Sequence, residues 1–362
     1  MVVIVSGGGT GGHIYPAIAI AKEIIQMENR ARIVYIGGKD RREERIVPNF
    51  GFEFISVPVE SFPRSLSARW FKVAYKVPAG FIKSMFVLKE LSPSVAVGTG
   101  GYVCGPVMLA SALRGIPTMI QEQNAFPGLT NRILARWVDE IHVPYEKAAE
   151  FFPEEKVRIT ANPVRPGMAE VKDGREKFGL SMDKTTVSFV GGSQGAHSIN
   201  MAMVDALKYM EDLANELQMI HQTGTSDYET VKKAYDDSPF QGVVQPYFDN
   251  IEYLYSATDL IVCRSGAMTL SEITTCGLPA ILVPYPYHKD NHQKFNAEAL
   301  EQKGAAIMML DQELTGNSLS QAIRKIIKDK NRLADMTEKS HLQGQPGAAK
   351  ILAEAALRLA SS

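Results

Sequence analysis

Two glycine-rich loops, one in each half of the chain, constrain its fold more than any other feature. The first, Gly7–His13, follows the apolar run Val2–Val5, and the second, Gly191–Ala196, follows Thr186–Val190. Each pattern predicts a strand, a tight turn and a helix, which places backbone N–H groups where they can hold a phosphate or diphosphate. Glycine suits such a turn because a Cβ would disfavour positive φ and keep the ligand away. Two such loops predict two nucleotide-type domains facing each other across a cleft.

Short apolar runs alternate with helical patterns along the whole chain, which is typical of α/β proteins whose parallel sheets are covered on both faces. The predicted strands are Val2–Ser6, Arg32–Gly37, Phe52–Val57, Val95–Thr99, Pro117–Gln121, Glu140–Val143, Val157–Thr160, Thr186–Val190, Gln218–Gln222, Val243–Tyr247, Asp259–Cys263, Ala280–Pro284 and Ala306–Met309. A chain of 362 residues suffices for two domains. The Pro- and Gly-rich segment 161–167 is the best linker. We expect domains at 1–163 and 164–342, and a C-terminal helix in 343–362 that packs back on the first domain.

Composition excludes several classes of function. The formal net charge is −1, so no basic excess points to nucleic acid. Three cysteines, Cys104, Cys263 and Cys276, lack metal-type spacing and indicate a reducing, cytosolic compartment. The N-terminus has no basic region, so we expect no signal peptide there. No apolar stretch is long enough to span a bilayer, so we expect any membrane role to be peripheral.

The first loop also matches G-x-G-x-x-G through Gly7, Gly9 and Gly12, which alone is a weak sign of a dinucleotide fold. A strand that serves NAD usually ends near an acidic residue, but here Gly37 and Gly38 stand at that position. An oxidoreductase is therefore disfavoured without being excluded. His13 enters the helix after the loop, where it is either a general base or a capping residue.

Polar residues gather after two more strands of the first half. The cluster Gly98–Pro106 ends the fourth strand, and Gln121–Asn124 ends the next one. Both lie at the carboxyl edge of the predicted sheet, where open α/β sheets bind ligands. The alternative is a set of turn and cap residues.

The second half repeats this arrangement at Arg264–Ala267, which opens another helix N-terminus after a strand. Glu272, two turns along, is either a partner for ribose hydroxyls or an exposed helix charge. The loop His288–Gln293 is rich in donors, but its spacing does not favour a metal site. The chain has no Asp-x-Asp run, so we expect no metal and no cofactor, with backbone amides and helix termini offsetting the charge of a diphosphate.

The segment Arg69–Leu91 is amphipathic. Its apolar residues recur at helical spacing, namely Trp70, Ala74, Val77, Phe81, Met85 and Leu88, and Arg69, Lys72, Lys76 and Lys83 share another face. Such a segment either docks on an anionic membrane surface or packs on the core. Pro78 is expected to break it into two helices.

Together these segments resemble the MurG family of peptidoglycan N-acetylglucosaminyltransferases. The residues that carry the resemblance are Gly8–His13, Gly98–Tyr102, Gln121–Asn124, Asn162–Arg165, Gly191–Ala196, Cys263–Ala267 and Ser271–Glu272. Several ordered motifs from the first strand to residue 293 make it far more specific than one glycine loop. One departure is Ala161, where the family usually has glycine.

The resemblance implies a GT-B glycosyltransferase, with two Rossmann-like domains and the active site between them. It implies inverting transfer of N-acetylglucosamine from UDP-N-acetylglucosamine to undecaprenyl-pyrophosphoryl-MurNAc-pentapeptide, the last membrane-associated cytoplasmic step of peptidoglycan precursor synthesis, a process on which cell shape and division depend. It places such a protein at the cytoplasmic face of the bacterial plasma membrane, as a peripheral protein on an anionic surface.

The resemblance also implies roles for single residues. His13 would be the base on the acceptor hydroxyl, helped by Asn124, and Glu272 would hold the ribose. The backbone at Phe248 would read the uracil edge. The sugar nucleotide would contact Thr10, Gly11, Gly12, Asn124, Arg165, Ser193, Phe248, Ala267, Met268, Thr269, Leu270, Ser271, Glu272 and Gln293. Membrane docking would use Trp70, Lys72, Phe81 and Phe86.

Three alternatives stay open at this point. A UDP-N-acetylglucosamine 2-epimerase has the same architecture but would act on the donor alone. An NAD-dependent oxidoreductase would bind NADH rather than UDP. A sugar-nucleotide sensor would bind the donor without turnover, although intact motifs at both loops disfavour it.

Overall fold

A computed structural model of the chain describes residues 1–60, 69–165, 167–192, 194–287 and 291–361. It divides into two compact units. The first unit comprises Met1–Pro166 and Pro346–Ser362, and the second unit comprises Gly167–Gln345. The chain therefore passes between the units twice, at 166–167 and at 345–346, and the C-terminal segment belongs to the first unit.

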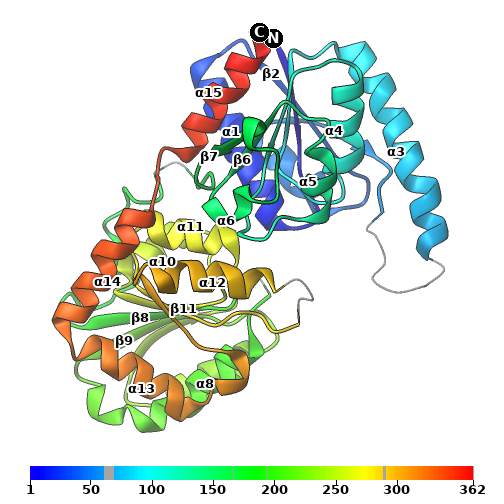
Figure 1. The fold of residues 1–362 in the computed structure, drawn as a ribbon. Helices are drawn as coiled ribbons and strands as arrows, with labels where there is room; N and C mark the ends of the chain where they lie inside the picture. The colour runs from blue at the N-terminus through cyan, green and yellow to red at the C-terminus, as the bar shows by residue number, and fades with distance from the viewer. Residues whose placement is uncertain (61–68, 166, 193, 288–290, 362) are drawn as a thin grey trace. The chain divides into compact units, whose positions relative to one another are not determined.

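The first unit is built on a seven-stranded parallel sheet (Figure 1). Its strands are β1 (Val2–Ser6), β2 (Arg32–Gly38), β3 (Glu53–Val57), β4 (Val95–Gly98), β5 (Thr118–Gln121), β6 (Glu140–Val143) and β7 (Val157–Ile159). Their order is β3-β2-β1-β4-β5-β6-β7, and Val3 pairs with both Ile33 and Val95. The order reverses direction between β1 and β4, and open α/β sheets bind ligands beyond the carboxyl ends of the strands at such a point.

The second unit repeats this plan with six parallel strands. They are β8 (Thr185–Val190), β9 (Leu217–Gln222), β10 (Gln241–Gln245), β11 (Leu260–Cys263), β12 (Ala280–Leu282) and β13 (Ala306–Met308), in the order β10-β9-β8-β11-β12-β13. Its reversal lies between β8 and β11. All the strands predicted from the sequence are present, with ends within two residues of the predicted ones. The prediction of parallel sheets is confirmed.

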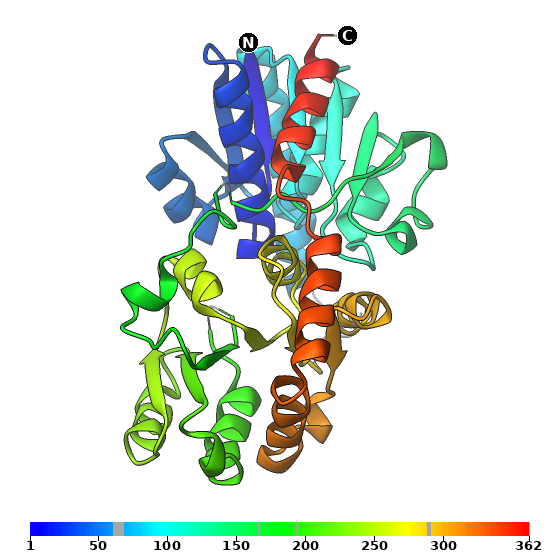
Figure 2. The ribbon, with the colours of Figure 1, turned by 90° about the vertical axis from the view of Figure 1, so that its left-hand side faces the viewer.

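Helices cover both faces of the first sheet, because successive residues along its strands belong alternately to two cores. Val3 and Val5 pack toward α1 (Gly11–Met27) and α15 (Ala348–Ala360), whereas Ile4 packs with α3 (Arg69–Leu91) and α4 (Cys104–Leu113). Figures 1 and 2 both show α15 alongside α1, with the two termini at the same end of this unit. The shorter helices here are α2 (Arg42–Ile46), α5 (Leu129–Leu134) and α6 (Glu146–Ala149).

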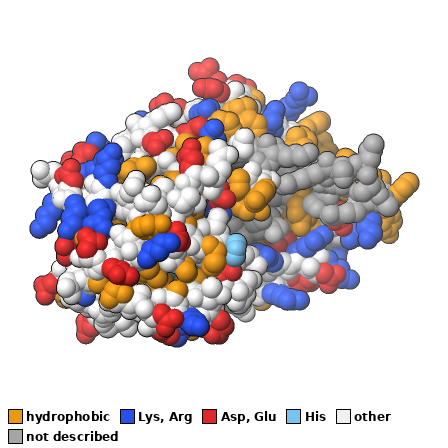
Figure 3. Space-filling view, turned by 90° about the horizontal axis from the view of Figure 1, so that it is seen from below, with side chains coloured by type: hydrophobic (Ala, Val, Ile, Leu, Met, Phe, Trp, Pro, Cys, Tyr) orange, Lys and Arg blue, Asp and Glu red, His pale blue; other side chains and the backbone are white. Residues whose placement is uncertain are grey.

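The second sheet is covered in the same way. One core contains residues of α8 (His197–Ala206), α9 (Tyr228–Asp236) and α13 (Gly316–Ile327), and the other contains α10 (Ile251–Ala257), α11 (Ala267–Thr275) and α12 (His292–Gln302). The remaining helices are α7 (Gly174–Lys177) and α14 (Lys330–Gln343). Figure 3, a view from below, shows basic and acidic side chains interspersed. Ion pairs of Arg324 with Asp212 and of Lys328 with Glu216, both at 2.7 Å, belong to this unit's surface.

An ion pair ties α15 to the first sheet. Arg358 Nη2 lies 2.8 Å from both carboxylate oxygens of Glu140, which is buried on β6. Burial acts to raise the pKa of Glu140, but the hydrogen bonds from Arg358 and the nearby His142 outweigh it and hold the pKa below its usual value. The C-terminal helix is thus held by charge as well as by its alanine-rich face.

The structure corrects the prediction for the segment around Pro78. It is one helix, α3, of 23 residues with Pro78 inside. Proline removes one backbone hydrogen bond but leaves the rest of the helix, which is held on both sides of it: Val73 before it and Leu88 after it are buried. Gly80 fits close against the carbonyl oxygen of Pro58, where a Cβ would collide.

His221 is a buried histidine in the core of the second unit. Its Nε2 lies 2.9 Å from Asn200 Oδ1, and its Nδ1 lies 3.4 Å from the Tyr235 hydroxyl. The Asn200 amide nitrogen donates elsewhere, to Thr223 O and Asp227 Oδ2, so Asn200 Oδ1 accepts the Nε2–H. Burial lowers the pKa of His221 from 6.5 to about 3.

This burial predicts a pH-dependent stability for the second unit. Between pH 6.5 and about 3 the unfolded chain binds a proton at His221 that the folded one does not, so stability is complete above pH 6.5 and falls as the pH drops. At about 1.4 kcal/mol per pH unit, about 2 kcal/mol should be lost by pH 5. The variant His221→Gln keeps a donor for Asn200 but has no imidazole to titrate. Its loss of stability over the same pH interval should therefore be smaller than that of the wild type by about 2 kcal/mol. Hydrogen exchange of the β9 amides at pH 7.5 and 5 measures it, and equal losses in both proteins would contradict the assignment.

Candidate functional site

The loops that follow β1 and β4 pack against each other at the reversal point of the first sheet. Gly8 N lies 3.4 Å from Gly100 O. Gly101 has a φ of +79°, and a Cβ on it would collide with the Gly8 carbonyl oxygen, so this close approach requires glycine. The two glycine clusters singled out in the first half of the sequence are thus brought together.

A buried carboxylate occupies part of the first loop. Glu43 is fully buried, and its oxygens accept hydrogen bonds at 3.1 Å from Gly9 N and from Gly38 N. Sequence reasoning missed this residue, because it lies on α2 after the second strand and carries no local signal. The Gly9 amide is therefore engaged inside the unit. The amides of Gly11 and Gly12 at the start of α1, with Thr10 in the N-cap position, can face an anion.

His13 is half-buried in the first turn of α1. Its Nδ1 lies 2.7 Å from Gln123 Oε1 and 2.9 Å from Thr99 O. The Thr99 hydroxyl donates back to His13 O at 2.7 Å. The structure thus joins the histidine of the first loop to the residues after β4 and β5, as their place at the carboxyl edge of the sheet leads one to expect.

Glu122 organises the segment after β5. Although almost fully buried, it accepts hydrogen bonds from Gln123 N, from the backbone and side chain of Asn124, from Gly128 N and from Asn131 Nδ2, at 2.9 to 3.0 Å. Such a carboxylate fixes the loop and the half-buried side chain of Asn124 at the same edge as His13. Among the described residues, Asn131 Oδ1 is the buried side-chain atom with no hydrogen-bond partner.

Arg165 belongs to the first unit. Its guanidinium lies 5.7 Å from the centre of the Tyr15 ring on α1, a cation–π contact. The other predicted contacts to the sugar nucleotide in this unit are Thr10, Gly11, Gly12 and Asn124, and all belong to the edge that carries His13.

The second glycine loop lies at the reversal point of the second sheet, before α8. Gly195 has a φ of +76°, and a Cβ there would collide with the Thr223 carbonyl oxygen, so the β8 and β9 loops approach closely only because of glycine. Ser193, a predicted donor contact, lies outside the described residues. A cavity of about 490 Å³ opens beside this loop, a size that suits a small-molecule ligand. Its lining residues are Gly191, Gly192, Gly195, Ala196, His197, Ser198, Arg264, Gly266, Thr269, Tyr285, Tyr287, Gln293 and Asp311.

Arg264 braces this cavity. Its Nη1 donates to Asp311 Oδ1 at 2.6 Å and to the carbonyls of Val283 and Pro284, and its Nη2 donates to Ser198 Oγ at 2.8 Å. The Arg264 guanidinium thus links the end of β11, which carries it, to the residues after β12 and to α8. The sequence signals Arg264 as part of a motif, but it does not signal Asp311.

Helix α11 presents its N-terminus to the same cavity. Gly266 is its N-cap, so the amides of Ala267, Met268 and Thr269 form the first turn and can face an anion. Glu272, one turn further, accepts a hydrogen bond of 2.9 Å from the Tyr255 hydroxyl, which orients its carboxylate.

Two other predicted contacts on α11 are engaged inside the unit. Leu270 is buried in the core and its N–H donates to Gly266 O, so it offers a nucleotide neither side chain nor amide. The Ser271 hydroxyl donates to Ala267 O at 3.0 Å, a bond within the helix.

Phe248 and Gln293 are held by neighbouring loops. Phe248 is buried, and its N–H donates to Gln222 Oε1 at 3.0 Å, so its carbonyl is the backbone group suited to a base N–H. Gln293 lines the cavity, where its side-chain oxygen accepts from Tyr285 N and its carbonyl accepts from Ser265 Oγ.

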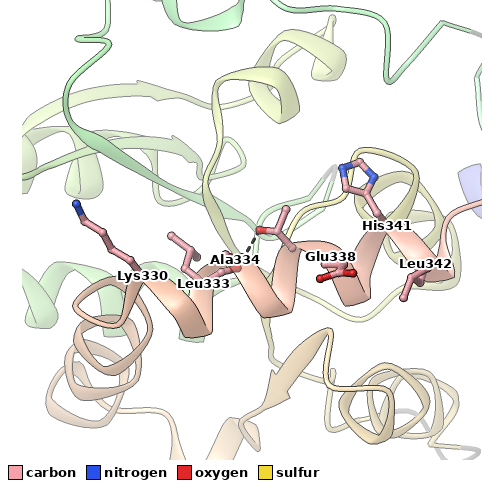
Figure 4. A pocket seen from close by; sticks show the side chains of 7 residues that line it. Lys330, Leu333, Ala334, Glu338, His341 and Leu342 are labelled. Carbon is pink, nitrogen blue, oxygen red and sulfur yellow. Dashed lines mark hydrogen bonds between the residues drawn. The ribbon is translucent and has the colours of Figure 1, made fainter.

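A second hollow of about 600 Å³ runs along α14 (Figure 4). Its lining residues all come from this one helix: Lys330, Leu333, Ala334, Thr337, Glu338, His341 and Leu342. The Thr337 hydroxyl donates a hydrogen bond of 2.9 Å to Leu333 O. A hollow lined by one helix face lacks the convergent polar groups of a nucleotide site. Among the described residues, no cluster of three or more acidic, His or Cys side chains could hold a metal ion, and no helix is both long and apolar enough to cross a bilayer.

Comparison with known proteins agrees with this geometry. Residues 3–143 match the glycosyltransferase family 28 N-terminal domain, and residues 186–352 match its C-terminal domain. A relative from Caldanaerobacter subterraneus subsp. tengcongensis, named UDP-N-acetylglucosamine--N-acetylmuramyl-(pentapeptide) pyrophosphoryl-undecaprenol N-acetylglucosamine transferase, is 45% identical over 345 residues, which cover 92% of this chain and 93% of the relative.

Solved structures give the same result. MurG from Acinetobacter baumannii is 29% identical, with a TM-score of 0.79 over 99% of both chains. The UDP-GlcNAc 2-epimerase from Neisseria meningitidis is 14% identical with a TM-score of 0.70, covering 99% of this chain and 100% of its own, and this likeness shows the fold alone. The matches to both family 28 domains, together with two Rossmann-like units that carry ligand-type loops at their reversal points, identify a GT-B glycosyltransferase. The chain belongs to the MurG family of N-acetylglucosaminyltransferases within glycosyltransferase family 28.

Proposed function

We propose that this protein transfers N-acetylglucosamine from UDP-N-acetylglucosamine to undecaprenyl-pyrophosphoryl-MurNAc-pentapeptide, with inversion at the anomeric carbon. The observation that carries this proposal is the near-full-length likeness to the transferase from Caldanaerobacter, which is named for these substrates. The alternative of an NAD-dependent oxidoreductase is disfavoured by the same likeness. The 2-epimerase shares the fold at an identity too low to support its activity here.

The second unit supplies the groups for the donor. Amides at the start of α11 and of α8 suit the diphosphate, because helix N-termini favour negative charge. Glu272, oriented by Tyr255, is our partner for the two ribose hydroxyls, and the Phe248 carbonyl is our partner for the uracil. Gln293 and Ser193 complete the proposed set. As the sugar–phosphate bond breaks, its electrons leave with UDP, and the amides stabilise the added charge.

The first unit supplies the base for the acceptor and further groups for the donor. We assign His13 as the general base, which takes the proton of the muramyl hydroxyl while that oxygen bonds to the anomeric carbon. Asn124, fixed by Glu122, would assist this base, and Asn124 and the α1 amides of Gly11 and Gly12 are our further contacts to the sugar nucleotide. Arg165, beside Tyr15, adds a positive charge near the same helix.

Transfer of labelled N-acetylglucosamine to a short-chain lipid-linked acceptor tests the function. We expect labelled disaccharide and UDP in equal amounts, and no product when either substrate is left out. Donor incubated alone should yield no manno sugar. Formation of that epimer without acceptor would establish the alternative activity. If neither disaccharide nor epimer formed, both activities would be excluded.

We also propose that the protein docks peripherally on the anionic cytoplasmic leaflet through α3. On this helix Phe71, Tyr75, Ile82 and Phe86 are exposed, at 54 to 82% of their surface, and their spacing puts them on one face; Trp70 is exposed beside them. Lys72 and Lys83 are exposed on the adjoining face. A face of aromatic and aliphatic side chains bordered by lysines suits an anionic membrane surface.

The structure changes the residue set predicted for docking. Phe81, predicted from the sequence to face the membrane, is partly buried against the core of the first unit together with Met85. The second half of the apolar stripe read from the sequence, Phe81, Met85 and Leu88, therefore faces the core, whereas Trp70 and Ala74 at its start are exposed. The proposed docking surface is Trp70, Phe71, Lys72, Tyr75, Ile82, Lys83 and Phe86.

Vesicle sedimentation tests the docking surface. The double variant Phe71→Ser/Phe86→Ser should bind vesicles rich in anionic phospholipid at least tenfold more weakly than the wild type, because each aromatic side chain loses its burial in the interface. Leu342→Ser, which removes an exposed leucine from α14 in the second unit, should bind like the wild type. Unchanged binding by the double variant would refute the assignment.

A further inference from the structure

We propose that Gln123 is a positioning residue that holds His13 in the Nδ1–H tautomer, so that Nε2 carries the lone pair a base requires. The inference rests on the proposed function for the role of the base, but its geometry is independent of any substrate. It depends on three successive hydrogen-bonding steps, from Asn162 through Gln121 and Gln123 to the imidazole.

The surroundings of His13 Nδ1 fix which nitrogen bears the proton. Nδ1 lies 2.7 Å from Gln123 Oε1 and 2.9 Å from the carbonyl oxygen of Thr99. A backbone carbonyl can only accept, so Nδ1 must donate to it. In a neutral imidazole the other nitrogen then has no hydrogen and offers its lone pair.

The orientation of the Gln123 amide follows from its other neighbours. Its Nε2 lies 2.8 Å from Thr99 O and 3.0 Å from Gln121 O, and both are carbonyl oxygens, which can only accept. The NH₂ group must therefore face these carbonyls, and the side-chain oxygen must face His13. A reversed amide would set two carbonyl oxygens against a third oxygen and the imidazole N–H against an NH₂ group.

A second layer holds Gln123 itself. Gln121 Oε1 accepts from Gln123 Nε2 at 2.5 Å, and Gln121 Nε2 donates to Asn162 Oδ1 at 2.7 Å. Asn162 Nδ2 donates to the backbone carbonyl of Gln123 at 3.0 Å, which closes the network. All three amide side chains are at most 2% exposed, so water does not compete for these bonds.

Other groups around the ring agree with this assignment. The Thr99 hydroxyl donates to His13 O, which ties the helix turn that carries the imidazole to the β4 loop. Gly100 leaves room for the ring, because a Cβ on it would lie within 3.3 Å of both Nδ1 and Cε1. Tautomer and ring position are therefore set before any substrate arrives, which is how a general base avoids reorganisation in the transition state.

Nitrogen-15 NMR of histidine-labelled full-length protein, without substrate, tests the tautomer directly. Long-range correlation spectra distinguish protonated from bare ring nitrogens, and a His13→Gln sample identifies the His13 signals among the seven histidines. Above the pH at which the ring is neutral, we expect protonated Nδ1 and bare Nε2. A protonated Nε2 in the wild type would overturn the proposal, whatever the enzyme does.

The variant Gln123→Met tests the positioning role. It keeps the side-chain length and removes one of the two acceptors at Nδ1, leaving the Thr99 carbonyl, so a minor signal from the Nε2–H tautomer should appear beside that of the Nδ1–H tautomer. We expect kcat to fall about tenfold, the loss expected for one hydrogen bond, while KM for UDP-N-acetylglucosamine stays unchanged. Gln218→Met is the matched control. It deletes another buried amide, which bonds Ser181 and Thr186 near the start of β9 in the second unit, and it should change neither tautomer nor kcat.

The outcomes separate this proposal from the proposed function. An unchanged tautomer in Gln123→Met, or an equal fall of kcat in Gln218→Met, would overturn the positioning role. Should Gln123→Met fail to fold, Gln121→Met loosens the same amide more gently, and it should show the same tautomer signal at a smaller fraction. If the protein carried the Nδ1–H tautomer but transferred no sugar, the proposed function would be refuted. The positioning of His13 by Gln123 would still stand.

Discussion

Replacing His13 with alanine should lower kcat about 10²- to 10⁴-fold, the range that a positioned general base contributes. The dissociation constant for UDP-N-acetylglucosamine should stay within about twofold of the wild type. The reason for this separation is structural. His13 is anchored to Thr99 and Gln123 in the first unit, whereas the amides proposed for the diphosphate and the carboxylate proposed for the ribose belong to α8 and α11 of the second.

Steady-state kinetics with a lipid-linked acceptor and calorimetric titration with the donor measure the two quantities. His341→Ala, an exposed histidine on α14, is the matched control and should keep both values. Full activity of His13→Ala would remove His13 from the mechanism. A loss of donor affinity as large as the loss of kcat would instead make His13 a ground-state binding residue.

The sequence was sufficient for the architecture, because strand periodicity and glycine turns are local signals. The runs Val2–Ser6 and Thr185–Val190 are buried from their second residue onward, as strands of a doubly covered parallel sheet must be, and each leads straight into a glycine turn. The carboxyl ends of parallel strands lie at one edge of the sheet, so His13 and Gln121–Asn124 could be assigned to a common edge before their contacts were known.

The parts that escaped prediction depend on contacts between distant segments. Glu43 reaches the Gly9 amide from 34 residues away, and Asp311 reaches Arg264 from 47 residues away. Neither carboxylate stands in a pattern that differs from an ordinary surface charge. Phe81 fitted the apolar period of α3, but the period alone does not reveal which face the core covers. The role of Gln123 depends on the orientation of an amide, which only its neighbours fix.

Glu122→Gln should be the most disruptive single-atom change in the first unit. The glutamine oxygen can keep the three bonds now made to one carboxylate oxygen, from Gln123 N, Asn124 N and Asn124 Nδ2. Its NH₂ group would then face the donors Gly128 N and Asn131 Nδ2. Asn131 can turn its unpartnered oxygen toward that group, but the Gly128 amide cannot adapt.

The expected cost is about 2–4 kcal/mol in the free energy of unfolding of the first unit, since bonds to a buried charge are lost and one donor is left unsatisfied. We expect kcat to fall at least tenfold as well, because the backbone N–H groups of Asn124 and Gln123 both donate to this carboxylate. Urea unfolding followed by tryptophan fluorescence reports on the first unit, since both tryptophans, Trp70 and Trp137, belong to it.

Glu90→Gln provides the matched control. Glu90 is exposed near the end of α3, so its amide should change the unfolding free energy by less than about 0.5 kcal/mol. If Glu122→Gln unfolded at the same urea concentration as the wild type, the carboxylate would not be the centre of the loop. If it lost stability but kept full kcat, the positions of Asn124 and Gln123 would not depend on Glu122, and the link between this buried charge and the His13 edge would fail.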